Sequence, residues 1–180
     1  MRWSLCFAIL VGMSQSVTIV GAGLAGSEAA LQLADRGVRV RLVEMRPKTP
    51  TLVHVTGCCA ELVCSNSLKS EKPDSAAGML KRELAELGSQ LYAQAKLHAV
   101  PAGGALAVDR TAFAEAVTAL VEAHPLIDLV HEEVVDLVQA AEGADALVVA
   151  AGPLASDALA ASLSRLAGEE HLAFYDLSLI

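Results

Sequence analysis

Three glycines near the start of the chain have the spacing of a turn that holds a pyrophosphate. Gly21, Gly23 and Gly26 lie between an apolar run typical of a buried strand and a stretch with helical spacing of apolar residues. In such a turn the first glycine permits the tight bend, the second lets backbone approach the ligand, and the third allows close packing of helix on strand. The helix start adds free N–H groups and the positive end of its dipole. The predicted pyrophosphate-binding residues are Gly21, Ala22, Gly23, Leu24, Ala25 and Gly26.

An acidic residue follows where a dinucleotide-binding fold places one. Glu44 ends the next predicted strand, 18 positions after Gly26. A carboxylate at about this distance accepts hydrogen bonds from the adenosine ribose. It also repels a 2′-phosphate, so we expect FAD or NAD rather than NADP. With the acid in place, glycines that serve only a tight crossover are the weaker interpretation, and spacing alone leaves both FAD and NAD open.

A second group of residues could in principle bind zinc. His54, Cys58, Cys59 and Cys64 offer four potential ligands within a short stretch. Adjacent cysteines seldom point at one ion, and these cysteines form no C-x-x-C pair. We therefore expect no metal site, and we expect Cys58 and Cys59 to be small buried apolar side chains.

Cys64 differs from its neighbours because small hydrogen-bonding residues follow it in the sequence CSNS. We interpret this stretch as the start of a helix, where backbone N–H groups stabilise a thiolate. A thiolate of this kind can act as a nucleophile or as a proton-transferring group. The pattern alone leaves a catalytic role and a packing role equally open.

The elements that must position these residues alternate between strand and helix. The patterns predict strands over 17–23, 38–45 and 144–152, one or two strands over 126–139, and helices over 24–37, 76–97, 111–124 and 156–168. Residues 46–73 have no sustained period and form a long excursion. Within the predicted helix 76–97, an apolar stripe is assigned to the core; it consists of Leu80, Leu84, Leu87 and Leu91. This order predicts an α/β, Rossmann-like domain with a parallel sheet and a helical excursion inserted after the second strand.

Composition limits the class of protein. The chain has 180 residues, of which 54% are hydrophobic and 19% charged, which fits one α/β domain better than disorder. Its formal net charge of −8 argues against binding DNA or RNA through a broad basic face, so any RNA contact must be local. The cysteines are not needed as disulfide staples in a chain with this much apolar material. We expect a cytoplasmic protein.

The first 12 residues complicate that expectation. Arg2 and the apolar run after it, in MRWSLCFAILVG, resemble a signal peptide, although the run is too short to span a membrane. The sequence MSQS that follows is a poor cleavage site, and Met13 lies a few residues before the first predicted strand. We expect residues 1–12 to be a non-native extension, translation to begin at Met13, and 13–180 to form the nucleotide-binding domain.

Four blocks of sequence resemble the folate- and FAD-dependent tRNA (uracil-5-)-methyltransferases, the TrmFO family. The blocks are VTIVGAGLAGSEAALQLADRGVRVRLVEMRP, AELVCSNSLKS, AVPAGGALAVDRTAFAEAV and AAGPLASDALAASL. The resemblance implies that Gly21 to Gly26 bind the FAD pyrophosphate, that Glu44 binds the ribose, and that Cys64 is catalytic. It further implies methylenetetrahydrofolate as the carbon donor, NAD(P)H as the reductant of the flavin, and the T loop of tRNA as substrate.

The chain also departs from this family. Its sequence HVTGCC before AELVC lacks a second histidine and an aromatic residue that the family usually has there. The family is more than twice as long, so we expect an incomplete domain that binds FAD weakly and is inactive alone. Related wobble-uridine-modifying flavoproteins share the glycine loop but not the CSNS block. The other alternative is a noncatalytic remnant that only binds nucleotide.

Overall fold

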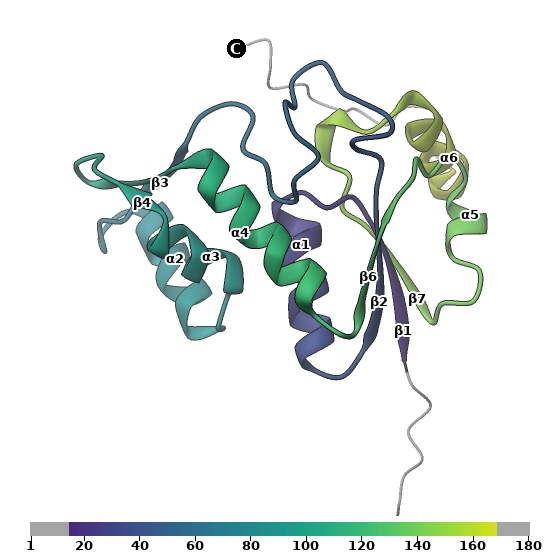
Figure 1. Ribbon diagram of the computed structural model, residues 1–180, viewed down its shortest axis with the longest axis horizontal. Coiled ribbons are helices and arrows are strands. Elements are labelled where there is room, and N and C mark those ends of the chain that lie inside the picture. Colours follow the sequence, from purple (N-terminus) through teal and green to yellow (C-terminus); the bar gives the residue numbers. More distant parts are fainter. Residues whose placement is uncertain (1–14, 169–180) are drawn as a thin grey trace, which may run out of the picture.

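A parallel sheet of four strands forms the larger part of the structure, a computed structural model that describes residues 15–168 (Figure 1). The expected extension over 1–12 lies outside the described residues. The order across this sheet is β6 (Ile127–His131), β2 (Arg39–Glu44), β1 (Ser16–Val20) and β7 (Ala146–Val149). All three neighbouring pairs are parallel. Along the chain these strands are the third, second, first and fourth of the sheet, which is the order that begins a dinucleotide-binding sheet.

Helices cover both faces of the sheet. Figure 1 shows α1 (Leu24–Asp35) and α4 (Arg110–Ala123) on one face, and α5 (Leu137–Ala140) and α6 (Asp157–Ala167) on the other. Buried strands need apolar residues on both faces: β1 (SVTIV) ends in three consecutive buried residues, and β2 (RVRLVE) has exposed arginines at its start and buried residues at its end. The predicted α/β, Rossmann-like class with a parallel sheet is confirmed.

Several helix ends follow local signals in the sequence. Gly37 adopts φ +83 just after α1, where its N–H donates to the Ala34 carbonyl and the Val38 N–H donates to the Leu33 carbonyl. This pair of hydrogen bonds is a Schellman motif. Ser156 caps α6 by accepting from the Leu159 N–H, and Gly168 ends that helix with φ +66. These predicted ends are confirmed.

The predicted single helix over 76–97 is wrong. The structure has two helices there, α2 (Ala76–Glu86) and α3 (Gln90–Leu97). Gly88, with φ +72, lies between them, and the Ser89 hydroxyl caps α3 by accepting from the Tyr92 N–H. The break places the leucines of the expected stripe in different environments: Leu80 is 56% and Leu87 73% exposed, Leu84 is half-buried, and only Leu91 is buried.

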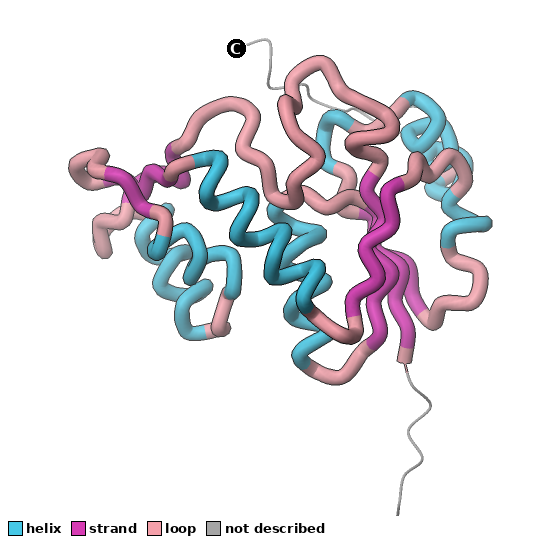
Figure 2. The backbone as a smooth tube through the Cα atoms, in the orientation of Figure 1, coloured by secondary structure: helices cyan, strands magenta, loops and turns pink. Residues whose placement is uncertain are grey.

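The excursion after β2 contains a small sheet that the sequence patterns did not predict. Its antiparallel order is β3 (Ser67–Ser70), β5 (Ala105–Val108) and β4 (Ala99–Val100). In Figure 2 the loop after β2 runs over the upper end of the large sheet before it reaches this smaller unit. The excursion is therefore helical only in part.

The stretch 126–139, expected to be one or two strands, is one strand followed by a short helix. After β6 the chain continues into α5, because the Asp136 carboxylate accepts from the N–H groups of Val138 and Gln139. Ser162 of α6 also accepts from the Leu137 N–H, at 2.9 Å. Among residues 15–168, none of the helices has the length and apolar character needed to cross a bilayer.

Phe113 of α4 is a main contributor to the core, since its side chain is fully buried. We expect Phe113→Ala to lower the free energy of unfolding by about 3–5 kcal/mol, because it removes buried apolar contacts and leaves a cavity. Urea denaturation measures the loss. Leu80→Ala is the matched control at an exposed position, and we expect a change of about 0.5 kcal/mol or less. Equal losses in the two variants would show that α4 does not pack as described.

Candidate functional site

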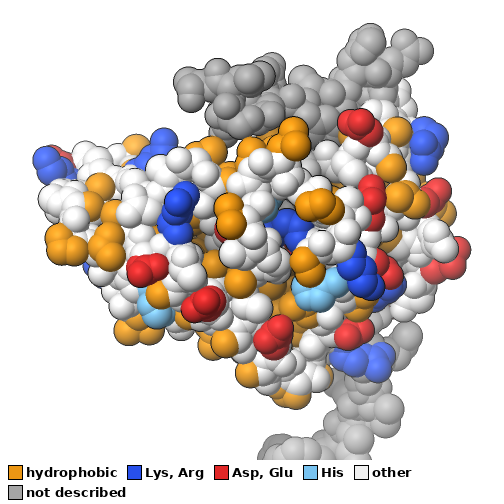
Figure 3. Space-filling model, turned by 45° about the horizontal axis from the view of Figure 1, so that its top comes forward, with side chains coloured by type: hydrophobic (Ala, Val, Ile, Leu, Met, Phe, Trp, Pro, Cys, Tyr) orange, Lys and Arg blue, Asp and Glu red, His pale blue; other side chains and the backbone are white. Residues whose placement is uncertain are grey.

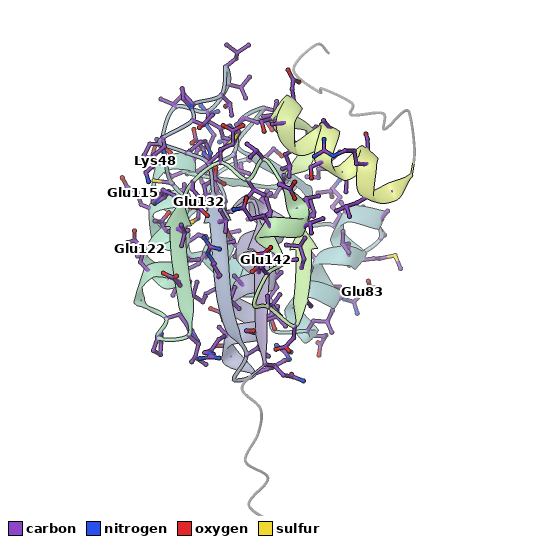
Figure 4. All side chains as sticks on the ribbon, turned by 90° about the vertical axis from the view of Figure 1, so that its right-hand side faces the viewer. Lys48, Glu83, Glu115, Glu122, Glu132 and Glu142 are labelled. Atoms are coloured by element: carbon purple, nitrogen blue, oxygen red, sulfur yellow. The ribbon has the colours of Figure 1, made fainter. Side chains whose placement is uncertain are left out.

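The glycine loop lies at the carboxyl end of the parallel sheet. It connects β1 to α1 beside β7, where the strand order reverses and open α/β sheets bind their ligands. One pocket at this edge is lined by both Gly21 and Glu44. Its remaining walls are Val20, Val43, Met45, Glu132, Glu133, Val134, Ala151, Ala155, Ser156 and Leu159. Figure 4 shows Glu132 near the upper end of the sheet, where β6 ends.

The three glycines have different structural reasons. Gly21 adopts φ +99, and a Cβ there would lie 2.7 Å from the Ala150 carbonyl oxygen. A Cβ at Gly26 would lie 1.8 Å from the Gly21 carbonyl oxygen, so α1 can approach β1 only without a side chain. A Cβ at Gly23, in contrast, would meet no atom of the described residues within 4 Å. The fold does not require glycine at position 23, and its absent side chain leaves open space above the loop.

The start of α1 faces this open space. Gly23 is the N-cap residue, and within the described part of the chain no side chain caps the helix and no acidic residue lies in its first turn. Helix starts of this kind attract anions, because their N–H groups lack intrahelical partners. The loop therefore fits a pyrophosphate, with room at Gly23 and donors from the first turn of α1.

Glu44 is buried against the same loop. Its Oε2 accepts from the Ala22 N–H at 2.9 Å, and its Oε1 accepts from Arg46 Nε at 2.8 Å and from the Arg46 backbone N–H at 3.1 Å. Burial acts to raise the pKa of Glu44, but the hydrogen bonds from Arg46 and Ala22 outweigh it and the pKa lies below its usual value. Glu44 is therefore a carboxylate at neutral pH and lies next to the glycine loop.

Arg46 is a residue that the sequence patterns missed. Its side chain is only 3% exposed, and its Nη1 contacts Glu61 Oε2 at 3.0 Å and the Thr56 carbonyl at 3.3 Å. Arg46 thus joins the end of β2 to the excursion. Two features of the sequence could have pointed to Arg46. It is a charged residue two positions after the end of a buried strand, and it belongs to VEMRP in the first block that resembles the family.

The excursion returns to the glycine loop at Cys59 and Ala60. The Ala60 N–H donates to the Ala22 carbonyl at 2.8 Å, and the Cys59 N–H donates to Thr118 Oγ1 at 2.9 Å. Cys59 is fully buried, and burial raises the pKa of its thiol to about 11. The predicted packing role of Cys59 is confirmed. Cys58 is half-buried, so the expectation of a buried side chain is wrong for Cys58.

The predicted helix start at Cys64 is wrong. Cys64 is exposed and lies in a loop that leads into β3. The residues after Cys64 form a turn and then a strand instead of a helix. Ser65 Oγ accepts from the Ser67 N–H, and Ser67 pairs with Ala107 of β5. The helix start near Cys64 is that of α4: an open depression on the surface is lined by Cys64, Ser65, Asn66, Val100, Val108, Asp109 and Arg110.

Cys64 and Glu44 therefore line different pockets, and the structure does not bring them together in one. The four possible zinc ligands are also not assembled into one site. His54 Nδ1 lies 2.7 Å from Thr51 Oγ1, Cys59 is buried and Cys64 is exposed. Across residues 15–168, no three side chains of His, Cys, Asp or Glu are grouped as metal ligands.

Charges of both signs are mixed on the described surface. On the face seen in Figure 3, Lys and Arg side chains lie among Asp and Glu side chains, with apolar side chains scattered between them. Leu52 and Val55 of the excursion are among the exposed apolar residues. Within residues 15–168, this face has no continuous basic field of the kind that binds nucleic acid through phosphates alone.

Comparison with known proteins gives consistent matches. The family described as Glucose inhibited division protein A matches residues 16–177. The chain is 53% identical over 164 residues to "Methylenetetrahydrofolate--tRNA-(uracil-5-)-methyltransferase TrmFO" of Desulforudis audaxviator, and it is 54% identical over 160 residues to the protein of that name from Symbiobacterium thermophilum. These matches cover 91% and 89% of this chain but 36% and 35% of the relatives. The chain thus spans about a third of the length of these curated relatives.

Among solved structures, the chain is similar to the tetrameric form of 2-methyl-3-hydroxypyridine-5-carboxylic acid oxygenase. The TM-score is 0.40 at 17% sequence identity, and the match covers 66% of this chain and 32% of that chain.

Proposed function

The chain belongs to the Glucose inhibited division protein A family, and from this premise we propose that it forms the FAD-binding part of a folate-dependent tRNA (uracil-5-)-methyltransferase. The names of the relatives reported above support the proposed methyltransferase activity. The observation that carries the cofactor assignment is the open space at Gly23, directly over the start of α1 and beside the ionised Glu44. Neither a positive φ nor a close neighbouring atom demands glycine at this position.

The residues present fit FAD as follows. The backbone from Gly21 to Gly26 would hold the pyrophosphate, and the Glu44 carboxylate would accept hydrogen bonds from the adenosine ribose. Reduced FAD would supply the two electrons that turn a methylene group into a methyl group. Methylenetetrahydrofolate would be the carbon donor, and NAD(P)H would reduce the flavin.

Cys64 is the proposed catalytic residue. Uracil is a poor carbon nucleophile at C5, and a thiolate that adds to C6 makes C5 nucleophilic. In the other role open to it, the Cys64 thiolate removes the C5 proton after the methylene group has been attached. Either role requires contact with a base that has left its stack in the T loop. The exposure of Cys64 on an open surface supports such access.

Two measurements on the full protein that carries this sequence test the proposal. We expect flavin absorbance bands in the purified protein, because the glycine loop and Glu44 provide a nucleotide site. We also expect ribothymidine in a T-loop RNA after addition of methylenetetrahydrofolate and NAD(P)H. Bound flavin without methylation would favour the alternative of a noncatalytic nucleotide-binding protein, and failure to bind flavin would overturn the cofactor assignment.

A further inference from the structure

We propose that Arg46 is a positioning residue for the nucleotide site: it holds the Glu44 carboxylate ionised and turned toward the glycine loop. This inference rests on the proposed FAD site. It concerns a residue that lines neither the pocket of Gly21 and Glu44 nor the depression of Cys64. Arg46 would act on the cofactor only through Glu44.

The geometry gives Arg46 control over one oxygen of the carboxylate. Arg46 donates twice to Glu44 Oε1, from Nε at 2.8 Å and from its backbone N–H at 3.1 Å. These two bonds leave Oε2 directed at the Ala22 N–H, 2.9 Å away in the glycine loop. Because Oε2 receives one bond from the loop, it keeps a lone pair for a ribose hydroxyl.

Arg46 is itself held in place from the opposite side. Its Nη1 contacts Glu61, and the Glu61 carboxylate also accepts from the N–H groups of Val55 and Thr56 and from the Thr56 hydroxyl. The Arg46 carbonyl contacts His131 Nδ1. A planar guanidinium that bridges two carboxylates from a buried position has little freedom to turn. The orientation of Glu44 is therefore fixed before any ligand arrives.

Because Glu44 is buried, its carboxylate needs the positive charge of Arg46 to remain ionised. Glu44 is 5% exposed, and a buried carboxylate without a cationic partner takes up a proton instead of remaining charged. In the described part of the chain, Arg46 is the basic side chain within hydrogen-bonding distance of Glu44. Other titratable groups face this region from the excursion and from β6 and the residues after it: His54, Cys59, Glu61, His131, Glu132 and Glu133.

The test is the pH dependence of FAD affinity in the full protein. Affinity is measured by quenching of flavin fluorescence from about pH 5.5 to about pH 8.5. A buried carboxyl group titrates in this range once its pKa is raised. We expect flat affinity in the parent. In Arg46→Met we expect about tenfold weaker binding at the acid end, the value of one charge-assisted hydrogen bond, with recovery as pH rises and Glu44 ionises. A merely structural role would weaken binding equally at every pH, and that result would overturn the proposal.

Three further variants isolate the cause. The double variant Glu44→Gln, Arg46→Met keeps both histidines but lacks the carboxyl group, so its affinity should be low and independent of pH. Arg46→Lys keeps the charge, and we expect flat affinity with a smaller loss; pH-dependent binding in this variant would contradict the charge argument. Arg39→Met removes an exposed arginine at the start of β2, the strand that ends at Glu44, and should bind like the parent.

A measurement without ligand separates this inference from the proposed function. In the parent, the lowered pKa of Glu44 contributes stability above the unfolded pKa, and this is lost as pH falls through the folded pKa. In Arg46→Met the pKa of Glu44 should be higher in the folded than in the unfolded protein, so the free energy of unfolding should fall as pH rises. The double variant has no carboxyl group at position 44 and should not show this fall. A parent that binds no FAD overturns the proposed function alone. An Arg46→Met protein whose stability rises with pH as in the parent overturns the inference.

Discussion

Replacing Cys64 by alanine is expected to abolish methyl transfer while FAD stays bound. Gly21 and Glu44 line a pocket that does not include Cys64, so the adenosine and pyrophosphate end of the cofactor needs no thiol. Loss of a thiolate that acts as nucleophile or proton acceptor should lower turnover by at least about 100-fold. The measurement is ribothymidine formed on a T-loop RNA per bound flavin, in the full protein.

The other two cysteines of this stretch serve as controls. Cys58→Ala should retain activity within a few-fold of the parent. Cys59→Ala should do so as well, but with a loss of roughly 1 kcal/mol in unfolding free energy, because its side chain is fully buried. Because Cys64 is exposed, Cys64→Ala should lower the free energy of unfolding by less than about 0.5 kcal/mol. Parental turnover in Cys64→Ala, or a Cys58 variant that is as inactive as the Cys64 variant, would contradict the catalytic assignment.

Gly23→Ala and Gly26→Ala are expected to fail in opposite ways. The new methyl group at position 23 meets open space, so the fold should lose no more than about 1 kcal/mol, the usual cost of a poorer N-cap. The same methyl would occupy the place proposed for the pyrophosphate, and FAD affinity should fall about 10- to 100-fold, as when a hydrogen bond to a charged group is lost. Fluorescence titration with FAD measures this change.

At position 26 the added Cβ would lie 1.8 Å from the Gly21 carbonyl oxygen and 3.0 Å from the Gly21 carbonyl carbon, and this backbone cannot move aside without shifting the loop. Gly26→Ala should therefore destabilise the protein by about 3 kcal/mol or more, measured by chemical denaturation. The pair distinguishes a glycine kept for the ligand from one kept for packing. If Gly23→Ala binds FAD like the parent, the open space above the loop is not where the pyrophosphate lies.

Local signals in the sequence account for much of the sheet and of the nucleotide site. Gly21, Gly26 and Glu44 were predictable because all three belong to one strand–helix–strand unit with a recognisable spacing, and the ends of α1 and α6 depend on single residues such as Gly37 and Ser156. The order and spacing of residue types within such a unit carry the information.

Features that depend on distant pairing were not predictable in this way. The loop around Cys64 leads into a strand because Ser67 pairs with Ala107, far along the chain. The apolar stripe of 76–97 fits one continuous helix, and the break at Gly88 is stabilised by Glu28 of α1, which accepts from the Ser89 hydroxyl and the N–H of Leu91. The role of Arg46 likewise depends on Glu61, which lies beside Arg46 only after the excursion has folded back toward the end of β2.

The long excursion between β2 and β6 also has a consequence for chain entropy. These strands are adjacent and parallel, yet Glu44 ends one and Ile127 begins the other, so the chain must close a very long loop before they pair. The entropic cost of closure grows only with the logarithm of loop length, by about 0.6 kcal/mol for each doubling. A crossover several times longer than a single helix thus costs roughly 1 kcal/mol more than a short one. At this small expense in free energy, the sheet that carries the proposed nucleotide site can also carry an inserted unit that presents Cys64.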